Sequence, residues 1–483
     1  MKSMHSKQFC YDLLIPILLL AINLIIKALF LGNGSLGGDE PFTVFYSQAD
    51  FSTFAAMMQD ENNPPLYFIL LHFWIKLFGI SVVSVRILPL IFSSLTVVFI
   101  YKLGQKFLNV RVALLASLLF TFSNFHTFFA HETRVYPLFT LLTTISMYSF
   151  LSLAGNKGGR KHFISLLFSN TLLIYSHFLG FFVILAQVIA VVFIRDFRKA
   201  ILKKYCFICL LTFVLYLPYL RLLISRFSTF NDKGTWVPSP TPEDLYTNLW
   251  KFSNAPVNTV VFILLMVTAL ILLILNRKKI SGIPPGNIKV ILIWFLVPYL
   301  LIFLISLVTP MFLDRYLIFI SIGYYLVIAV SIHFIGSGKN WIFYPLSVMA
   351  VFLMLFTYNP RTGDERNTQE LVNTIRQRKT GKTAVYLCPE WIDKGFVYYY
   401  NPEYFKDYKN TRTRLNTDHV FPINSAHQVN DTLLLNCESA IYLDGWSVQV
   451  DPENMIYRKL AGAFRKVECI ENFHGYKIYH FTR

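Results

Sequence analysis

The amino-acid sequence predicts a mainly α-helical protein that crosses a membrane about eleven times and carries a small α/β domain at its C-terminal end. Composition is the first reason, because 55% of the 483 residues are hydrophobic, only 15% are charged, and the mean hydropathy is +0.50. A soluble globular chain rarely contains so large an apolar fraction. The second reason is the pattern, because the apolar residues lie in separate runs of about 20 residues, the length of one spanning helix. The third is an abrupt change to polar composition after Thr357.

The first apolar run, from Leu13 to Leu31, follows a short polar start that contains Lys2 and Lys7. This run is long for a removable signal peptide, and its sequence is unlike a cleavage site. We therefore expect it to remain as the first span, with the amino end in the cytoplasm. The later runs of spanning length are 83–101, 111–130, 136–154, 163–178, 179–194, 205–224, 257–275, 290–308, 316–335 and 341–357.

The segment from Pro64 to Gly79 determines the orientation of every later span. Its roughly 16 residues are few for a span. If it is left out of the count, the basic gaps between the later runs all face the cytoplasm, as the positive-inside rule prefers. We therefore expect it to lie in the membrane interface or to re-enter the membrane. The chain after Thr357 is then expected outside the cytoplasm.

Charge and cysteine usage argue against two other classes of protein. The net charge of +17 comes from basic residues in short gaps between apolar runs, so it reports membrane orientation rather than a nucleic-acid-binding face. The six cysteines show neither the paired spacing nor the neighbouring histidines of a zinc site. Most are expected to be buried thiols, and a disulfide among the last three stays open.

The sequence divides into a transmembrane domain over residues 1–357, with outer loops at 32–82 and 225–256, and a domain over 358–483. The second domain alternates expected strands and helices, which is typical of a small α/β layer domain. It contains neither a phosphate-binding glycine loop nor a nucleophile elbow, so chemistry is not indicated there. Its expected elements are a helix at 364–378, strands at 383–388 and 440–443, a helix at 452–464, and strands at 466–469 and 476–481.

Two adjacent carboxylates, Asp39 and Glu40, follow the first span and a pair of glycines. Ionised groups so close to hydrocarbon are costly and need a partner, a metal or a task. One alternative is that they only cap or solvate a turn. The other is chemical, with one carboxylate taking a proton from an attacking hydroxyl while the other orients it or holds a divalent cation.

Two arginines stand where spans leave the membrane on the outer side. Arg134 lies between Glu132 and Tyr136, and Arg315 precedes Tyr316. These groups can be a local ion pair with interfacial tyrosine anchors. They also suit a lipid-linked phosphate, because a guanidinium group holds two phosphate oxygens at once.

Two further residues are weaker candidates. His177 interrupts an apolar stretch, where a lone histidine is more often a hydrogen-bonded residue at a helix end than a ligand; His131, beside Glu132, is similar. Asn63 precedes Pro64 and Pro65, and this motif by itself indicates only a rigid helix start.

Together these residues resemble a known family. The motifs follow one another in the sequence as the acidic pair after the first span, the Pro-Pro-Leu-Tyr helix start, "VRILPLIFSSLTVVFIYKLGQKF", "HETRVYPL", "YSHF" and "DRYLIF". Their order is similar to that of bacterial multi-pass glycosyltransferases. These are the enzymes related to protein O-mannosyltransferases and to the aminoarabinose and galacturonic acid transferases of lipid A and lipopolysaccharide core. The resemblance covers roughly residues 10–335, and it rests on the order and spacing of the motifs rather than on any one of them.

The resemblance implies the fold of the C-type glycosyltransferase superfamily and a polyprenyl-phosphate-linked sugar as donor. It implies transfer to a hydroxyl of a glycan, lipid or protein on the outer side of a bacterial inner membrane. Asp39 matches the catalytic acid of the family and Glu40 the acid that usually follows it. Inversion at the anomeric carbon is then expected, with a divalent metal ion as an optional cofactor at this pair.

One departure from the family pattern changes the expected phosphate ligands. The position before Pro-Pro is commonly histidine or lysine in the family, whereas this chain has Asn63. The phosphate role then falls on Arg134, Arg315 and His177, and 225–256 is the expected lid. The competing alternatives are a transporter or flippase of lipid-linked sugars and a structural membrane protein with an outer interaction domain.

Overall fold

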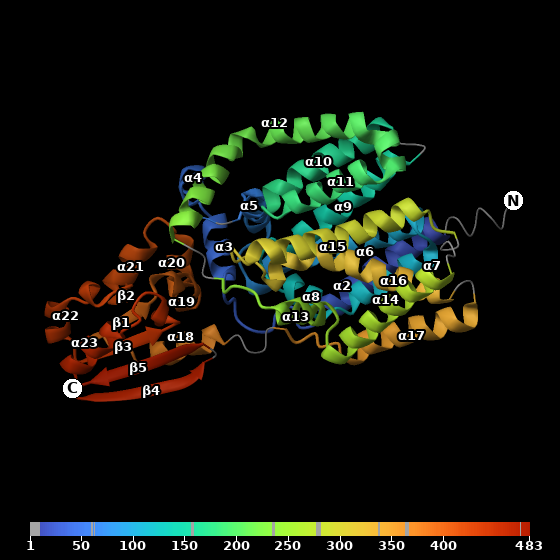
Figure 1. Cartoon of the computed structure of the whole chain (residues 1–483). Coiled ribbons are helices and arrows are strands. Elements are labelled where there is room, and N and C mark those ends of the chain that lie inside the picture. Colours follow the sequence, from blue (N-terminus) through green and yellow to red (C-terminus); the bar gives the residue numbers. More distant parts are fainter. Residues whose placement is uncertain are drawn as a thin grey trace. The chain divides into compact units, whose positions relative to one another are not determined.

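The structure is a computed structural model, and it describes residues 10–58, 61, 63–155, 159–233, 237–276, 282–336, 339–362, 367–473 and 475–483. Its chain forms two compact units. The helical unit comprises Met1–Leu31, Met58–Tyr67 and Arg86–Thr362. The sheet unit comprises Gly32–Met57, Phe68–Val85 and Gly363–Arg483, so it takes in the segment that carries Asp39 and Glu40. Figure 1 labels the elements of both units.

The helical unit is built from apolar helices of spanning length. Among the described residues, six helices are long and apolar enough to cross a membrane, and the number rises to seven if the bent pair α7 and α8 counts as one span. The predicted fold class is confirmed, whereas the number of about eleven spans stays a prediction. The elements are η1 (Cys10–Leu14), α2 (Ile15–Ala28), α6 (Val82–Phe107), α7 (Val110–Thr121), α8 (Asn124–Ala130), α9 (Tyr136–Ala154), α10 (Arg160–Ser176), α11 (Gly180–Phe193), α12 (Arg195–Lys233), α13 (Pro242–Phe252), α14 (Pro256–Asn276), α15 (Pro285–Ser306), η2 (Asp314–Ile320), α16 (Ser321–Gly336) and α17 (Asn340–Phe356).

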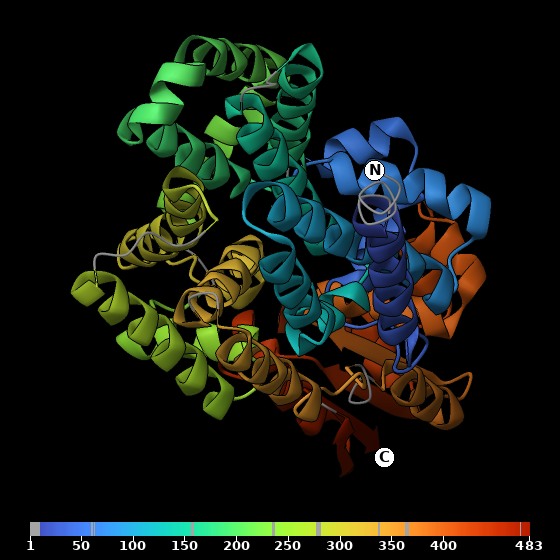
Figure 2. The ribbon, with the colours of Figure 1, turned by 90° about the vertical axis from the view of Figure 1, so that its right-hand side faces the viewer.

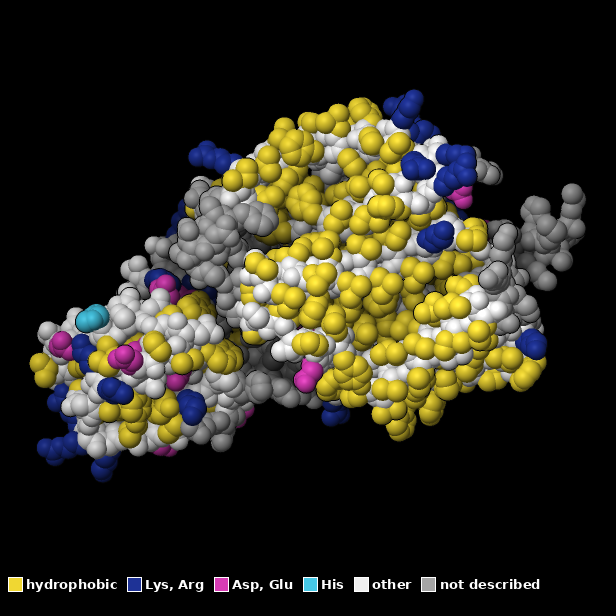
Figure 3. All heavy atoms as spheres, in the orientation of Figure 1, with side chains coloured by type: hydrophobic (Ala, Val, Ile, Leu, Met, Phe, Trp, Pro, Cys, Tyr) yellow, Lys and Arg dark blue, Asp and Glu magenta, His cyan; other side chains and the backbone are white. Residues whose placement is uncertain are grey.

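The outer surface of the helical unit is apolar. Hydrophobic side chains, yellow in Figure 3, cover the visible face over α12, α14, α15 and α17. Exposed examples include Leu210 and Phe213 of α12, Leu264 of α14 and Leu304 of α15. Soluble monomers rarely expose so continuous an apolar surface, so this face is suited to lipid.

Helix α16 forms the centre of the helical unit. Nearly all of its residues are buried, and it packs against α7, α14, α15 and α17. A helix that is apolar on all sides is stable only where neighbours cover every face. Figure 2 shows a second group, in which the helices from α9 to α12, coloured teal to green, lie together.

Two predicted spans have a different form in the structure. The run 111–130 is broken into α7 and α8, which are bent by 60°. The side chain of Ser123 accepts a hydrogen bond from the His126 amide and so starts a new helix at the break. The run 316–335 begins instead as the 3-10 helix η2 and continues as α16.

The segment predicted over 64–79 is the helix α5 (Leu66–Phe78) of 13 residues. It begins directly after Pro64 and Pro65, as expected for proline at a helix start. Its length is well below that of a spanning helix. A place in the membrane interface stays a prediction.

Gly104 of α6 marks a close approach of two helices. A Cβ atom at this position would lie 2.7 Å from Cα of Ala113 in α7. We expect Gly104→Ala to lower the free energy of unfolding by about 1–3 kcal/mol, because backbone cannot move aside as a flexible side chain can. The gain in helix propensity, about 1 kcal/mol, is too small to offset this clash. Thermal unfolding of the purified protein in detergent measures the change.

The control is Gly462→Ala in α23 (Met455–Ala463), where a Cβ atom would meet nothing within 4 Å. This variant should be stabilised by about 0.5–1 kcal/mol, since alanine loses less backbone entropy in a helix. A Gly104→Ala protein at least as stable as wild type would contradict the close approach of α6 and α7.

The described part of the sheet unit contains a five-stranded sheet with the order β2-β1-β3-β5-β4. Strand β1 is parallel to β2 and β3, and β5 is antiparallel to β3 and β4. The predicted strand at 383–388 is confirmed, whereas β2 was not predicted. The strands are β1 (Thr383–Cys388), β2 (Val420–Pro422), β3 (Ser439–Asp444), β4 (Lys466–Phe473) and β5 (Tyr476–Thr482).

Helices cover the sheet and join its strands. The core under them contains Tyr386, Tyr442, Leu460 and Phe481, all buried. The domain limit of 358–483 stays a prediction, because the compact unit also includes chain from the N-terminal part. The remaining elements of the sheet unit are α3 (Glu40–Ser47), α4 (Phe51–Met57), α18 (Thr368–Arg378), η3 (Glu390–Ile392), α19 (Asp393–Tyr400), α20 (Pro402–Lys406), α21 (Thr411–Thr417), η4 (Ala426–Gln428), α22 (Asp431–Asn436), η5 (Ser447–Gln449) and α23.

Candidate active site

The acid pair lies in a tight turn that leads into α3. Gly38 has a φ of +55°, a conformation that residues with a side chain rarely adopt, and Asp39 follows it as the residue before the first turn of α3. The main-chain carbonyl of Asp39 accepts hydrogen bonds from the amide (3.1 Å) and hydroxyl (2.9 Å) of Thr43. The turn and the helix together fix the backbone of Asp39.

The two carboxylates of the pair differ in environment. Glu40 is completely buried, and its Oε2 atom accepts a hydrogen bond of 3.3 Å from the Gly37 amide. Asp39 is exposed, and its side chain makes no capping hydrogen bond to α3. Simple capping therefore does not explain Asp39. Glu40 holds the turn closed, while Asp39 lies at the surface.

A second group of predicted residues gathers around His177 in the helical unit. His177 lies in the turn between α10 and α11, where its ring stacks on Phe139 of α9 with 4.8 Å between centroids. Tyr136, at the start of α9, lies 6.2 Å from the same ring, and Tyr316 of η2 lies 5.5 Å from it. The guanidinium of Arg315 lies 5.6 Å from the centre of the Tyr316 ring. Three segments that are distant in the sequence thus meet around His177, and we call this group, together with Arg134, the His177 cluster.

Electrostatics place both arginines near the same histidine. Arg134 and Arg315 both lie close enough to the buried His177 for their positive charges to act on its ring. The Nδ1 atom of His177 accepts a hydrogen bond of 3.2 Å from the Leu179 amide, so the imidazole is neutral and its ring hydrogen is on Nε2. His177 supplies a hydrogen-bond donor, and the two arginines supply the positive charge.

This protonation state gives a testable expectation for His177. Because Nδ1 already accepts a hydrogen bond and two guanidinium groups lie nearby, protonation of the ring is unfavourable, and its titration should add no inflection to the pH profile of kcat/KM between pH 8 and pH 5. His177→Asn keeps a neutral N–H donor and should lower activity by less than about tenfold, whereas His177→Leu removes the donor and should cost about 10- to 100-fold. An inflection near pH 6.5 that disappears in His177→Asn would contradict the neutral ring.

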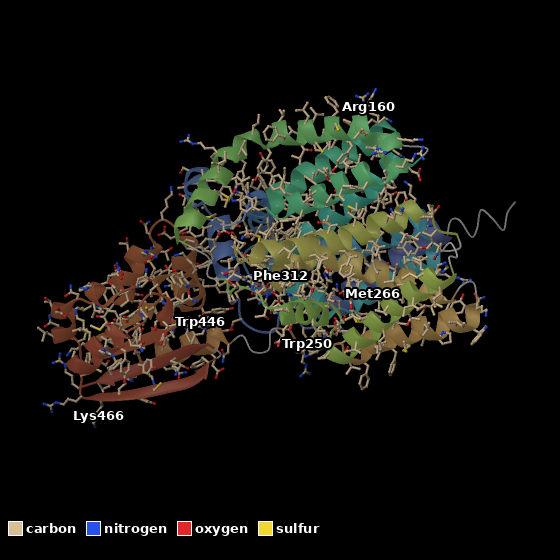
Figure 4. The ribbon with its side chains drawn as sticks, in the orientation of Figure 1. Arg160, Trp250, Met266, Phe312, Trp446 and Lys466 are labelled. Carbon is tan, nitrogen blue, oxygen red and sulfur yellow. The ribbon has the colours of Figure 1, made fainter. Side chains whose placement is uncertain are left out.

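An ion pair ties the expected lid to this cluster. Lys251 of α13 contacts Asp314 of η2 with 2.8 Å between Nζ and Oδ2, and Asp314 Oδ1 also accepts a hydrogen bond of 2.6 Å from the Arg315 amide. Phe312, which is labelled in Figure 4, lies just before η2 in the sequence and packs against Tyr299 and Phe303 of α15. Within the predicted lid at 225–256, α13 is therefore fixed to the segment that carries Arg315. Residues 234–236 of this predicted lid lie outside the described residues.

Three other candidates have structural partners. Both ring nitrogens of His131 are engaged, one with the Lys27 carbonyl (2.7 Å) and one with the Thr362 hydroxyl (2.8 Å). Asn63 is buried and donates from its side chain to Glu61 Oε1 (2.7 Å). Glu132 lies in the turn before α9, where its carbonyl accepts a hydrogen bond of 2.7 Å from the Arg134 amide. His131 and Asn63 have their side chains occupied, so they are weak candidates for substrate contact.

The metal prediction has limited support. Among the described residues, no three side chains of His, Cys, Asp or Glu are grouped as metal ligands. Two adjacent carboxylates are still compatible with Mg²⁺, which commonly takes one or two carboxylates and completes its shell with water and phosphate. A metal at Asp39 and Glu40 stays a prediction.

Comparison with known proteins supports the fold. Residues 62–220 match the family described as dolichyl-phosphate-mannose-protein mannosyltransferase. Among solved structures, ArnT from Cupriavidus metallidurans bound to undecaprenyl phosphate matches with a TM-score of 0.62 and 12% identity, over 96% of this chain and 97% of that one. The chain has the ArnT fold. The resemblance to protein O-mannosyltransferases and aminoarabinose transferases is thereby confirmed.

Structures of a second enzyme also match this chain, with lower TM-scores. The oligosaccharyltransferase of Archaeoglobus fulgidus in its apo form has a TM-score of 0.57 and 9% identity, over 92% of this chain and 71% of that one. The same enzyme in complex with Zn and sulfate gives 0.51 and 10%, over 92% and 69%. No curated protein matches the sequence significantly.

Proposed function

We propose that this protein is a membrane glycosyltransferase that moves a sugar from a polyprenyl-phosphate donor to a hydroxyl group of a cell-envelope glycan, lipid or protein. The observation that carries the proposal is the ArnT fold over almost the whole of both chains, together with two arginines beside one buried, neutral histidine. A phosphodiester donor needs such cations, because its phosphate becomes more negative as the sugar departs.

The transfer step assigns a role to each group. Asp39 accepts the proton of the acceptor hydroxyl, and the oxygen forms a bond to the anomeric carbon. The bond from that carbon to the phosphate oxygen breaks, which leaves polyprenyl phosphate with one additional negative charge. Arg134 and Arg315 stabilise this charge, and Nε2–H of His177 donates a hydrogen bond to a phosphate oxygen. A direct displacement of this kind inverts the anomeric centre.

The other predicted residues have supporting roles in this proposal. Glu40 holds the turn that carries Asp39, while Tyr136 and Tyr316 pack around His177 and limit the positions of the arginines. If a divalent metal binds, Asp39 and Glu40 would hold it, and it would supply charge for the phosphate. We place the protein in a bacterial inner membrane with the C-terminal domain on the outer side, as the positive-inside pattern favours.

The proposal is tested with membrane vesicles that contain the protein and a radiolabelled polyprenyl-phosphate sugar pool. The expected result is movement of label from the polyprenyl-phosphate lipid to a new product, in an amount that depends on the protein. If the label instead stays on the lipid and only changes its side of the membrane, the protein is a flippase and the transferase proposal fails.

A further inference from the structure

The turn that carries Asp39 is joined to the C-terminal domain by a partly buried hydrogen bond. The amide of Leu36 donates to the hydroxyl of Tyr399 in α19, with 2.5 Å between the two atoms. Leu36 itself is completely buried, so its amide would be costly to leave without this acceptor. Asp39 is only three residues further along the chain. The next residue after Leu36, Gly37, is the one held by Glu40.

Helix α3, which begins immediately after Asp39, packs on the same helix α19. The ammonium of Lys394 lies 4.7 Å from the centre of the Phe45 ring, and it also contacts buried Asp393 at 2.6 Å. Phe45 further contacts Phe405 of α20, with 5.3 Å between ring centroids. The segment is therefore held on both sides of Asp39, by Tyr399 before it and by the Lys394 and Phe405 contacts after it.

Two more hydrogen bonds fasten neighbouring chain to the same domain. The hydroxyl of Ser35 accepts from the Gln369 amide (2.9 Å), and Tyr398 donates from its hydroxyl to the Ile80 carbonyl (2.7 Å). Ile80 lies in the connection between α5 and α6. Adjacent tyrosines of α19 thus contact two segments of the N-terminal half, one of which carries the acid pair.

We infer that the C-terminal domain positions the catalytic base, and that Tyr399 is its main positioning residue. This inference rests on the proposed function, since it assigns Asp39 the role of base. The domain itself then needs no chemistry, in agreement with the missing catalytic motifs in its sequence. A general base works only within hydrogen-bond reach of the proton it removes, so a misplacement of about 1 Å costs a large part of the rate.

The test compares Tyr399→Phe with Tyr400→Phe. Both variants lose one tyrosine hydroxyl from α19, but the Tyr400 hydroxyl donates to Asp418 within the domain (3.3 Å) and does not contact the acid turn. Hydrogen–deuterium exchange of residues 32–47 is measured in detergent, together with kcat and KM for the polyprenyl-phosphate sugar that the vesicle assay identifies. Tyr398→Phe serves as a second variant, with exchange read at residues 79–83.

We expect Tyr399→Phe to accelerate exchange in residues 32–47 and to lower kcat roughly 10- to 100-fold while KM for the donor stays unchanged. Tyr400→Phe should resemble wild type in both measurements. Unchanged exchange in Tyr399→Phe, or faster exchange with unchanged kcat, would overturn the inference. If wild type transfers no sugar at all, the proposed function fails, and the exchange data alone decide whether the domain holds the turn.

Discussion

Replacing Asp39 by asparagine should lower kcat for sugar transfer by about 10²- to 10⁴-fold, the usual contribution of a general base. Asparagine has nearly the same volume as aspartate but does not accept a proton. The Asp39 backbone hydrogen bonds to Thr43 do not involve the side chain, so the turn should keep its shape. KM for the donor should change little. Transfer is measured with the radiolabelled donor in vesicles that contain equal amounts of protein.

The matched control for this experiment is Asp50→Asn, in the same N-terminal segment of the sheet unit. Asp50 forms an exposed ion pair with Lys409 (2.7 Å), and exposed pairs of this kind contribute little to stability, about 0–1 kcal/mol. This variant should retain nearly full activity. Glu40→Gln keeps an oxygen that can accept from the Gly37 amide, so it should lose less activity than Asp39→Asn. Equal activity of Asp39→Asn and wild type would exclude Asp39 as the base.

Replacing either arginine of the His177 cluster by glutamine should lower kcat/KM for the donor by about 10²-fold. Each guanidinium is proposed to stabilise the charge that grows on the leaving phosphate, and such interactions typically contribute 10²- to 10³-fold each. Lysine in place of arginine should restore activity only in part, because an ammonium group is a single point of charge and lacks the planar fork that binds two oxygens. Steady-state kinetics with the labelled donor measure both effects.

Binding of free undecaprenyl phosphate separates this role from a structural one. We expect Arg134→Gln and Arg315→Gln to weaken its inhibition of transfer, since it carries the phosphate that the arginines are proposed to hold. The control is Arg111→Gln, whose guanidinium stacks over Phe343 (5.5 Å) and Tyr344 (5.6 Å) elsewhere in the helical unit. Loss of stability without any change in donor kinetics would instead indicate that the arginines only anchor helix ends.

The apolar helices were the easiest part of the fold to predict. A run of apolar residues reports a helix in lipid directly, and the predicted 257–275 and 136–154 agree closely with α14 and α9. The break at Ser123 was missed because the polar residues of 121–127 are interspersed with phenylalanines, so 111–130 was counted as one apolar run although Ser123 is a typical residue for a helix start. Strand β2 was missed because three residues are too few to form a recognisable pattern.

The candidate site could also be predicted only in part from the sequence. Charged residues at the ends of apolar runs made Asp39, Arg134 and Arg315 candidates, because ionised groups beside lipid are costly and therefore informative. The different burial of Asp39 and Glu40 was not predictable, since adjacent carboxylates look alike in a sequence. Tyr399 was also missed, because its partner Leu36 is 363 residues away and no local pattern reports such a contact.

This long separation also affects how the protein is made. A ribosome adds about 5–20 residues per second, so Tyr399 is synthesised some tens of seconds after Leu36. During that time the first helices can already enter the membrane, but the turn with Asp39 lacks the partner that is proposed to fix it. In a partly synthesised chain at the membrane, Asp39 would therefore not yet be held in position. Catalysis would begin only after the C-terminal domain has been made and folded.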